Sequence, residues 1–284
     1  HLAMMHPHIA WAAQSRALMR RRPAALTRQR SSGGGAGESG GADAAAAFRA
    51  LALARRSARG FVAGREIPRD VLADVLAITQ RAPSSFNMQP WTCVVVRSEA
   101  GKELLSRAML SPSNKQRTLD ASAVAVFAAD LEPAHLLPKL VDMERAAGRH
   151  TSAGALDRLS VAAGFYATGG AIASVVKGAV ARALSPLQPM PQPVGQAAWA
   201  GQATMLAAQT FLFAAEAHGL ATAPMEGFDA QRAGVYLKLP RRYRATLVVA
   251  AGYAQPDDGA RSPRFDPDTV FFEDAFGTPF THIP

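Results

Sequence analysis

Three short stretches of this chain gather polar side chains that the packing of a core does not require. The first is RRSARGF, which contains Arg55, Arg56, Ser57 and Arg59. Guanidinium groups form forked hydrogen bonds that match phosphate oxygens, and the serine hydroxyl adds a further donor. This stretch is a candidate phosphate site, and the alternative is a solvated basic helix end.

The second stretch, PSSFNMQPW, places two hydroxyl and two amide side chains between two prolines. Each amide offers both a donor and an acceptor, which suits a heterocycle whose edge alternates the two kinds of group. A loop rich in turn-forming residues is also polar without any ligand. The candidate binding residues in this loop are Pro83, Ser84, Ser85, Asn87 and Gln89.

The third stretch, PMEGFD, contains Pro224, Met225, Glu226 and Gly227. Because glycine has no side chain, Gly227 would let the backbone approach a flat ligand closely.

The sequence predicts neither a metal site nor thiol catalysis. The seven histidines show no ligand spacing in the body of the chain, and the chain has no GxGxxG that opens a helix after a strand, no Walker loop and no HExxH. Cys93, the single cysteine, lies in the apolar run TCVVV, where we expect a buried thiol that acts as a small hydrophobic side chain.

The polar stretches must be positioned by helices and strands. Short β-branched runs predict buried strands, and apolar stripes at helical spacing predict helices. The expected strands cover residues 92–97, 121–128 and 245–253. The expected helices cover residues 43–56, 67–82, 99–109, 134–147, 156–184, 196–218 and 230–237, with Gly219 as a cap. Strands interleaved with long helices indicate an α/β or α+β sandwich.

Most of the net charge of +9 lies at the N-terminal end. Residues 1–37 hold six arginines and no acid, and the remainder carries 25 basic against 22 acidic side chains. We therefore expect a tail over residues 1–41 and a folded domain over residues 42–284 that binds no nucleic acid. The tail composition predicts a mitochondrial transit peptide followed by a Gly/Ser linker, and the alternative is a disordered tail on a cytoplasmic protein.

An uncharged run over residues 159–176 has the length of a transmembrane helix. Its residues are mostly small, so it carries too little apolar area to insert well. We expect a buried or interface helix and no stable membrane insertion.

Taken in order, the polar stretches resemble the FMN-dependent nitroreductase family, in particular the oxygen-insensitive, bacterial-type NAD(P)H nitroreductases. The resemblance runs from about residue 51 to residue 272. It includes RRSxRxF, PSSxNxQPW, NKQRTLDASAVAVF beginning at Asn114, and PMEGFD. The second and fourth motifs are specific, and all four occur in register.

The resemblance implies a role for each matching residue in the first half of the chain. Arg55 and Ser57 would hold the FMN phosphate and ribityl chain, with Arg56 among the cofactor-binding residues. Arg59 would lie near the flavin pyrimidine edge, where a cation stabilises negative charge. The PSSFNMQPW loop would cross the cofactor of the partner subunit, and Phe86 would shape substrate specificity.

In the second half, Asn114 would bind the flavin edge, and the backbone amide of the Glu226–Gly227 pair would face flavin N5. The family often places Lys-x-Arg on the phosphate near its C-terminus. Arg264 matches the arginine, whereas Ser262 stands at the lysine position and leaves Arg261 as a substitute.

The resemblance also implies an α+β fold with a central mixed β-sheet flanked by helices, assembled as an intertwined homodimer with two FMN sites. NADH or NADPH would reduce the flavin and a nitroaromatic or quinone would then reoxidise it, in a ping-pong mechanism. A flavin-dependent reductive dehalogenase and a flavin-fragmenting enzyme share the loop motifs and are the alternatives. Residues 149–194 resemble a family insertion in position only, and we expect them to line the substrate pocket.

Overall fold

The computed structural model describes residues 39–149, 152, 154–169, 171–191, 194–256 and 261–280. The chain divides into two compact units, His1–Phe48 and Arg49–Pro284. Helix α2, Ser39–Ala54, crosses the boundary between the units, and every other described helix and strand belongs to the second unit. The predicted transit peptide and most of the predicted linker lie outside the described residues.

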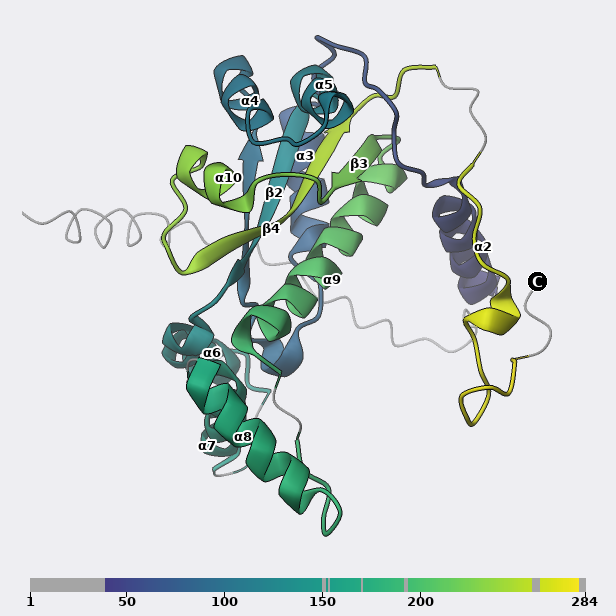
Figure 1. Ribbon diagram of the computed structural model, residues 1–284. Helices are drawn as coiled ribbons and strands as arrows, with labels where there is room; N and C mark the ends of the chain where they lie inside the picture. Colours follow the sequence, from purple (N-terminus) through teal and green to yellow (C-terminus); the bar gives the residue numbers. More distant parts are fainter. Residues whose placement is uncertain are drawn as a thin grey trace, which may run out of the picture. The chain divides into compact units, whose positions relative to one another are not determined.

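The second unit is built on a four-stranded sheet with the order β1-β2-β4-β3 (Figure 1). The strands are β1, Trp91–Val96; β2, Ala123–Asp130; β3, Ala221–Met225; and β4, Tyr243–Gly252. All three strand pairs are antiparallel. The sequence predicted a mixed sheet. In the described part of the chain, the only parallel pairing is an isolated bridge between Ser57 and Thr222. The α+β class is confirmed.

Helices cover both faces of the sheet because its central strands are apolar on both sides. In β2, Ala125 and Phe127 are buried on one face, and Val124 and Val126 are buried on the other. The first face packs against α3, Arg69–Thr79, and α9, Gln196–Ala217. The second face packs against α4, Glu99–Ser106, and α10, Ala230–Tyr236, and α5, Pro112–Asp120, packs beside α4.

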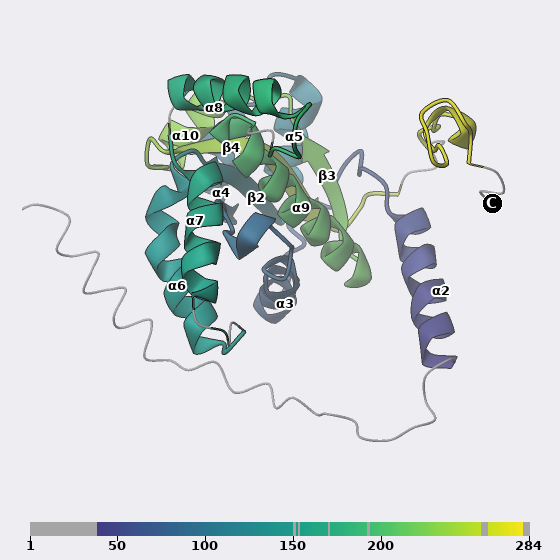
Figure 2. The same cartoon turned by 90° about the horizontal axis from the view of Figure 1, so that it is seen from below.

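A third apolar cluster anchors the PSSFNMQPW loop. Helices α6, Leu137–Ala146, and α7, Ala155–Ala167, lie side by side (Figure 2). The cluster joins Met88 of the loop to Leu140 of α6, Ala163 of α7 and Trp199 of α9. The loop is therefore held at the end of the sheet that these helices cover.

The single helix predicted over residues 156–184 is wrong, because the structure has two helices there, α7 and α8, Ala171–Leu184. Helix α7 ends at Ala167, because Thr168 has an extended backbone and Gly169 has a φ of +99°. The two helices are bent by 109°. No single helix in the described residues is long and apolar enough to cross a membrane, and this bent pair meets that test only when its two helices are counted together.

The other predicted helices and the three predicted strands are confirmed to within a few residues at their ends. Gly219 follows α9 with a φ of +68°, as expected for a capping glycine. Among the described α-helices and strands, α5 and β3 lie where the sequence predicted neither a helix nor a strand. Helix α5 begins with Pro112 after the N-cap Ser111, whose side chain accepts a hydrogen bond from the backbone N–H of Asn114.

Candidate functional site

One corner of the fold holds a buried guanidinium nitrogen and a buried hydroxyl without hydrogen-bond partners in the structure. They are Nη1 of Arg55 and Oγ1 of Thr222. The segment after α2 runs beside β3, since Ser57 forms a bridge with Thr222 and the N–H of Ala58 donates to the Thr222 carbonyl at 2.8 Å. A buried polar group without a partner is costly, so this corner suits a ligand that accepts hydrogen bonds.

Arg117 of α5 links the first and third polar stretches. Its Nε donates to the carbonyl of Arg59 at 3.3 Å, and its Nη1 donates to Oδ1 of Asn114 at 3.0 Å. The Nδ2 of Asn114 in turn lies 3.5 Å from the carbonyl oxygen of Gly227. A β-carbon at Gly227 would stand only 3.2 Å from that Nδ2, so the close approach favours glycine. The structure therefore brings these predicted residues together.

The PMEGFD stretch comprises the end of β3 and the turn that follows it. Pro224 and Met225 belong to β3, and the Met225 side chain is buried in the core. Glu226 is exposed, and the carbonyl of Gly227 accepts a hydrogen bond from the N–H of Leu110 at 3.0 Å. This bond fixes the turn that follows β3.

An acidic side chain lies among the arginines. Glu216, near the end of α9, interacts electrostatically with Arg55, Arg261 and Arg56. Burial raises the pKa of Glu216, and the positive charges of the three arginines oppose that rise. Arg56, Arg59 and Glu216 line a cavity of about 220 Å³. Positive charge from both ends of the domain sequence is thus gathered around one carboxyl group.

The two C-terminal arginines are placed differently. Arg261 donates to the carbonyl of Leu53, two residues before Arg55. Arg264, which matches the sequence motif better, donates to the carbonyls of Ser262 and Pro263 in its own segment. Arg261 therefore belongs with Arg55 and Arg56 to one arginine group around Glu216. Arg264 does not belong to this group.

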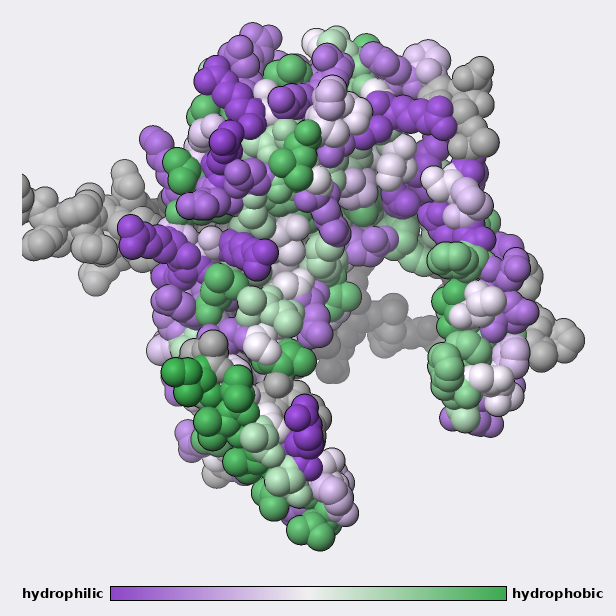
Figure 3. All heavy atoms as spheres, viewed as in Figure 1, coloured by the Kyte–Doolittle hydropathy of each residue, from purple (hydrophilic) through white to green (hydrophobic). Residues whose placement is uncertain are grey.

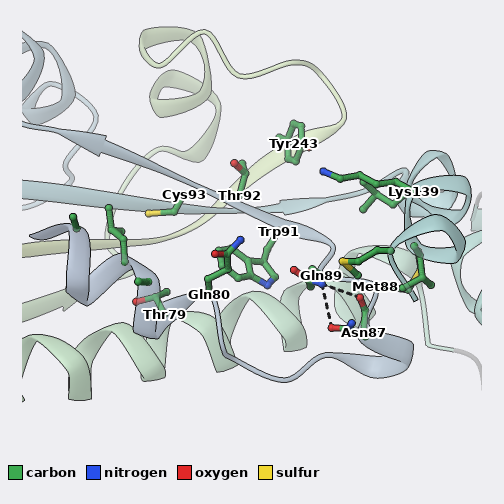
Figure 4. Close-up of a pocket in the computed structure, with 16 residues that line it drawn as sticks. Thr79, Gln80, Asn87, Met88, Gln89, Trp91, Thr92, Cys93, Lys139 and Tyr243 are labelled. Atoms are coloured by element: carbon green, nitrogen blue, oxygen red, sulfur yellow. Dashed lines mark hydrogen bonds between the residues drawn. The ribbon is translucent and has the colours of Figure 1, made fainter. Parts of the chain in front are cut away.

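The PSSFNMQPW loop lies beside a cavity of about 710 Å³ between α3, β1 and α6 (Figure 4). Asn87, Met88 and Gln89 line this cavity from the loop, and Trp91 and Cys93 line it from β1. Burial raises the pKa of the Cys93 thiol to about 12, so the thiol is neutral near pH 7. The described residues contain no group of three or more His, Cys, Asp or Glu side chains placed to hold a metal ion.

The hydroxyl residues of this loop have unequal environments. Ser84 is half-buried, and its Oγ accepts a hydrogen bond from the backbone N–H of Gln89 at 2.9 Å. Pro83 and Ser85 are exposed. Within this chain Ser84 therefore has a structural contact, and the surface formed by Pro83 and Ser85 is open to another molecule.

Phe86 begins a row of aromatic rings. Its ring packs against Tyr166 of α7 with centroids 5.6 Å apart, and Tyr166 stacks on Trp199 of α9 at 6.5 Å with an interplanar angle of 13°. Tyr166 belongs to the segment over residues 149–194. This segment therefore reaches the residue predicted to shape specificity.

A single chain does not bring the loop and the arginine group together. The strand register places Thr222 opposite Ala251 at one end of the sheet. At the other end Trp91, which closes the loop, pairs with Ala129, and the neighbouring Asp130 pairs with Tyr243. The two halves of the candidate site thus lie at opposite ends of the strands.

The sequence did not identify Arg117, Glu144, Glu216 and Thr222 as candidate residues. Arg117 follows Asn114 by three positions, so recognising α5 as a helix would have placed both side chains on one face. Glu144 accepts a hydrogen bond from Asn87, 57 residues away, and Glu216 lies about 160 residues beyond Arg55 and Arg56. No local pattern signals such distant contacts.

The comparison with protein-family models matches residues 52–253 to the Nitroreductase family. The chain therefore belongs to the Nitroreductase family. The matched span contains the three polar stretches and Asn114.

Curated relatives and solved structures agree with this assignment. The chain is 30% identical over 204 residues to an NADH dehydrogenase of Thermus thermophilus, covering 71% of this chain and 84% of the relative. It is 28% identical over 213 residues to an oxygen-insensitive NAD(P)H nitroreductase of Salmonella typhimurium, covering 73% and 89%. A nitroreductase-type protein of Exiguobacterium sibiricum, solved in complex with FMN, has the same fold, with a TM-score of 0.63, 22% identity and coverage of 77% and 93%.

Proposed function

We propose that this protein is an FMN-dependent oxidoreductase that transfers electrons from NADH or NADPH to nitroaromatic or quinone acceptors. The observation that carries the proposal is the group of donors at one end of the sheet, where Nη1 of Arg55 is buried without a partner. The printed names of the Thermus and Salmonella relatives support a nicotinamide donor, and the FMN of the Exiguobacterium structure supports the flavin.

The side chains at this end fit the phosphate half of FMN in kind. Arg55 and Arg261 offer guanidinium groups, and Ser57 offers a hydroxyl, all of which are donors to phosphate oxygens. The buried and unpartnered Oγ1 of Thr222 adds another polar atom at the same corner. We assign these residues, with Arg56 beside them, to the phosphate and ribityl end.

The residues joined by Arg117 fit the flavin ring. Because Arg117 occupies Oδ1 of Asn114, the Nδ2 of that amide is left to donate to a ring acceptor. Arg59 would place a positive charge near the pyrimidine edge, and the backbone of Glu226 and Gly227 would approach the ring closely. When bound, FMN supplies the capacity to take a hydride from the nicotinamide and to pass electrons to the acceptor in a ping-pong sequence. No side-chain acid or base is assigned.

We propose that the protein acts as an intertwined homodimer in which the PSSFNMQPW loop of one chain completes the site of its partner. The separation of the two half-sites supports this arrangement. Unpartnered apolar surface supports it as well, because Ile172, Val175, Val176 and Val180 of α8 are each more than half exposed. Apolar side chains gather over the α7–α8 region in Figure 3. Large exposed apolar patches mark interfaces.

We retain the division into a tail over residues 1–41 and an FMN-binding domain over residues 42–284 as a proposal. The family match begins at residue 52, which is consistent with a domain start near residue 42. The transit peptide stays a prediction, and the three relatives described above are bacterial proteins. Comparing where a fluorescent fusion of the full chain and one lacking residues 1–41 accumulate would test it.

The activity is tested by anaerobic mixing of the purified protein, supplied with FMN, with NADH or with NADPH. We expect the visible flavin absorbance to bleach with at least one donor and to recover when a nitroaromatic or a quinone is added. Bleaching without recovery for every acceptor of both classes would contradict the proposed acceptors. An FMN-loaded protein that neither nicotinamide reduces would contradict the proposed donor.

The composite site is tested by mixing two defective chains. A homodimer of Arg55→Ala chains has two damaged sites, and so has a homodimer of Asn87→Ala chains. A hybrid dimer with one chain of each variant has one site that carries both defects and one site that is intact. Random pairing of equal amounts then restores about a quarter of the wild-type FMN sites. Hybrids that are isolated through two different tags and still bind no more FMN than the parents would show that each site lies within one chain.

A further inference from the structure

The loop that carries Phe86 and Asn87 has an unusual backbone. Phe86, Asn87 and Gln89 have φ angles of +56°, +58° and +48°, in the left-handed region that residues other than glycine seldom adopt. Such a backbone conformation is strained for a residue with a side chain, and it persists only where the surroundings hold it. The conformation of this loop must therefore be stabilised by specific contacts.

Contacts inside the loop account for part of this stabilisation. The N–H of Asn87 donates to the carbonyl of Ser84 at 2.9 Å. The Nε2 of Gln89 lies 3.1 Å from Oδ1 and 3.2 Å from the carbonyl oxygen of Asn87 (Figure 4). These bonds fold the loop on itself, but they do not fix its orientation relative to the rest of the domain.

Glu144 of α6 supplies a contact from outside the loop. Its Oε1 accepts a hydrogen bond from Nδ2 of Asn87 at 2.8 Å and forms an ion pair with Nη1 of Arg149 at 3.1 Å. The Glu144 residue is only 2% exposed. A buried carboxylate is expensive unless it is paired, and hydrogen bonds to a charged acceptor are the stronger kind. The Asn87 amide is thus held at both ends, by Gln89 at Oδ1 and by Glu144 at Nδ2.

We propose that Glu144 is a positioning residue that orients the PSSFNMQPW loop, through Asn87, for contact with the cofactor. The inference rests on the proposed function. An apolar residue would fill the same buried position without a desolvation cost, so the carboxylate at this position serves the loop rather than the packing of α6. Arg149 extends the same link to the start of the segment over residues 149–194.

The test compares FMN affinities of full-length variants in a double-mutant cycle. We expect Glu144→Leu and Asn87→Ala each to weaken FMN binding about tenfold, and the double variant to be no weaker than either one, because both remove the same contact. Glu144→Gln keeps an acceptor of the same shape and should lose no more than about threefold. Asp142→Leu, which removes an exposed carboxylate of the same helix that pairs with Arg145, is the matched control and should bind as the wild type does.

A second readout needs no flavin. In the FMN-free protein, chymotryptic cleavage after Phe86 should be faster in Glu144→Leu than in Asp142→Leu, because the loop loses its outside anchor. If the leucine variant does not fold, the cycle is built with glutamine, which should weaken binding in the wild type and have no effect when Asn87 is already alanine.

Unchanged FMN affinity in a folded Glu144→Leu variant, or losses that simply add in the double variant, would overturn the positioning role and leave the proposed function standing. If the cycle is built with Glu144→Gln, an equal loss of FMN affinity in the wild type and in Asn87→Ala would also overturn the positioning role. A wild-type protein that takes up no FMN would instead overturn the proposed function, and this inference with it.

Discussion

The guanidinium of Arg117 donates to Oδ1 of Asn114 at 3.0 Å, and through Nε it also contacts the carbonyl of Arg59. One side chain thus fixes an amide and a backbone segment that the sequence separates by 55 positions. Because Arg117 holds Oδ1 and so orients the amide, a ligand at the Nδ2 end of Asn114 would present acceptors, such as the oxygens of a flavin.

Replacing Arg117 with methionine should weaken FMN binding about fivefold to tenfold, because Asn114 would be free to rotate its amide. The measurement is the dissociation constant from quenching of flavin fluorescence. Lys115→Met, at an exposed position on the same helix, is the control and should have no effect. Equal affinities for the two variants would show that Asn114 keeps its orientation without Arg117.

Replacing Arg55 with alanine should cost about 1.5 to 3 kcal/mol of FMN binding free energy, the range of a charged hydrogen-bonded contact. That cost corresponds to a dissociation constant about 10-fold to 150-fold higher. Arg69→Ala removes an exposed arginine at the start of α3 and is the control. A dissociation constant unchanged by Arg55→Ala would remove Arg55 from the phosphate site.

Glu216 should make cofactor affinity depend on pH. Burial raises its pKa, so the folded chain binds this proton more tightly than the unfolded chain, and the ionised carboxylate destabilises the fold as the pH rises through the raised pKa. The same ionisation places a negative charge beside the arginines proposed to bind phosphate. FMN affinity should therefore fall as the pH rises through that value.

Glu216→Gln should remove this part of the pH dependence and tighten FMN binding near pH 7 by about threefold to tenfold, the effect of removing one like charge. Titrations with FMN at several pH values measure both effects. Glu103→Gln, which neutralises an exposed acid on α4, should change neither. Weaker binding in Glu216→Gln would mean that the carboxylate holds the arginines in place.

Tyr166 should influence acceptor choice through Phe86, because the two rings are in contact. We expect Tyr166→Ala to shift the ratio of kcat/KM for a nitroaromatic over a quinone by about fivefold to tenfold, as the loss of a ring–ring contact predicts. FMN affinity should stay close to that of the wild type. Tyr166→Phe keeps the ring and is the control, and a ratio unchanged by Tyr166→Ala would exclude this role.

The sequence predicted those strands and helices that have a clear local pattern of apolar or β-branched residues. The runs over residues 92–97 and 245–253 are rich in β-branched or apolar residues, and both are strands. Strand β3 was missed because ATAPM is short and contains Pro224, a residue that a strand tolerates at the edge of a sheet, where β3 lies. Helix α5 was missed because SPSNKQRTLD has little apolar periodicity, although Ser111 and Pro112 are start signals.

Some residues of the candidate site could likewise be predicted from the sequence, and others could not. Residues that chemistry makes conspicuous, such as Arg55, Asn114 and Gly227, are recognisable from their motifs. The residues that position them are not recognisable in this way. The contact of Arg117 with Asn114 can be predicted only once α5 is recognised as a helix, and Glu144 meets Asn87 only in the folded chain. The preference for Arg264 over Arg261 followed motif spacing, whereas the structure joins Arg261 to the arginine group.

We propose above all that this chain binds FMN at the corner formed by Arg55, Ser57 and Thr222. The most direct measurement is the flavin content of the purified full-length protein after incubation with excess FMN and removal of the unbound cofactor, by visible absorbance against protein concentration. We expect one bound FMN per chain, and a strong reduction of that content in Arg55→Ala. A wild-type protein that retains no flavin, or an Arg55→Ala variant that retains as much as the wild type, would contradict it.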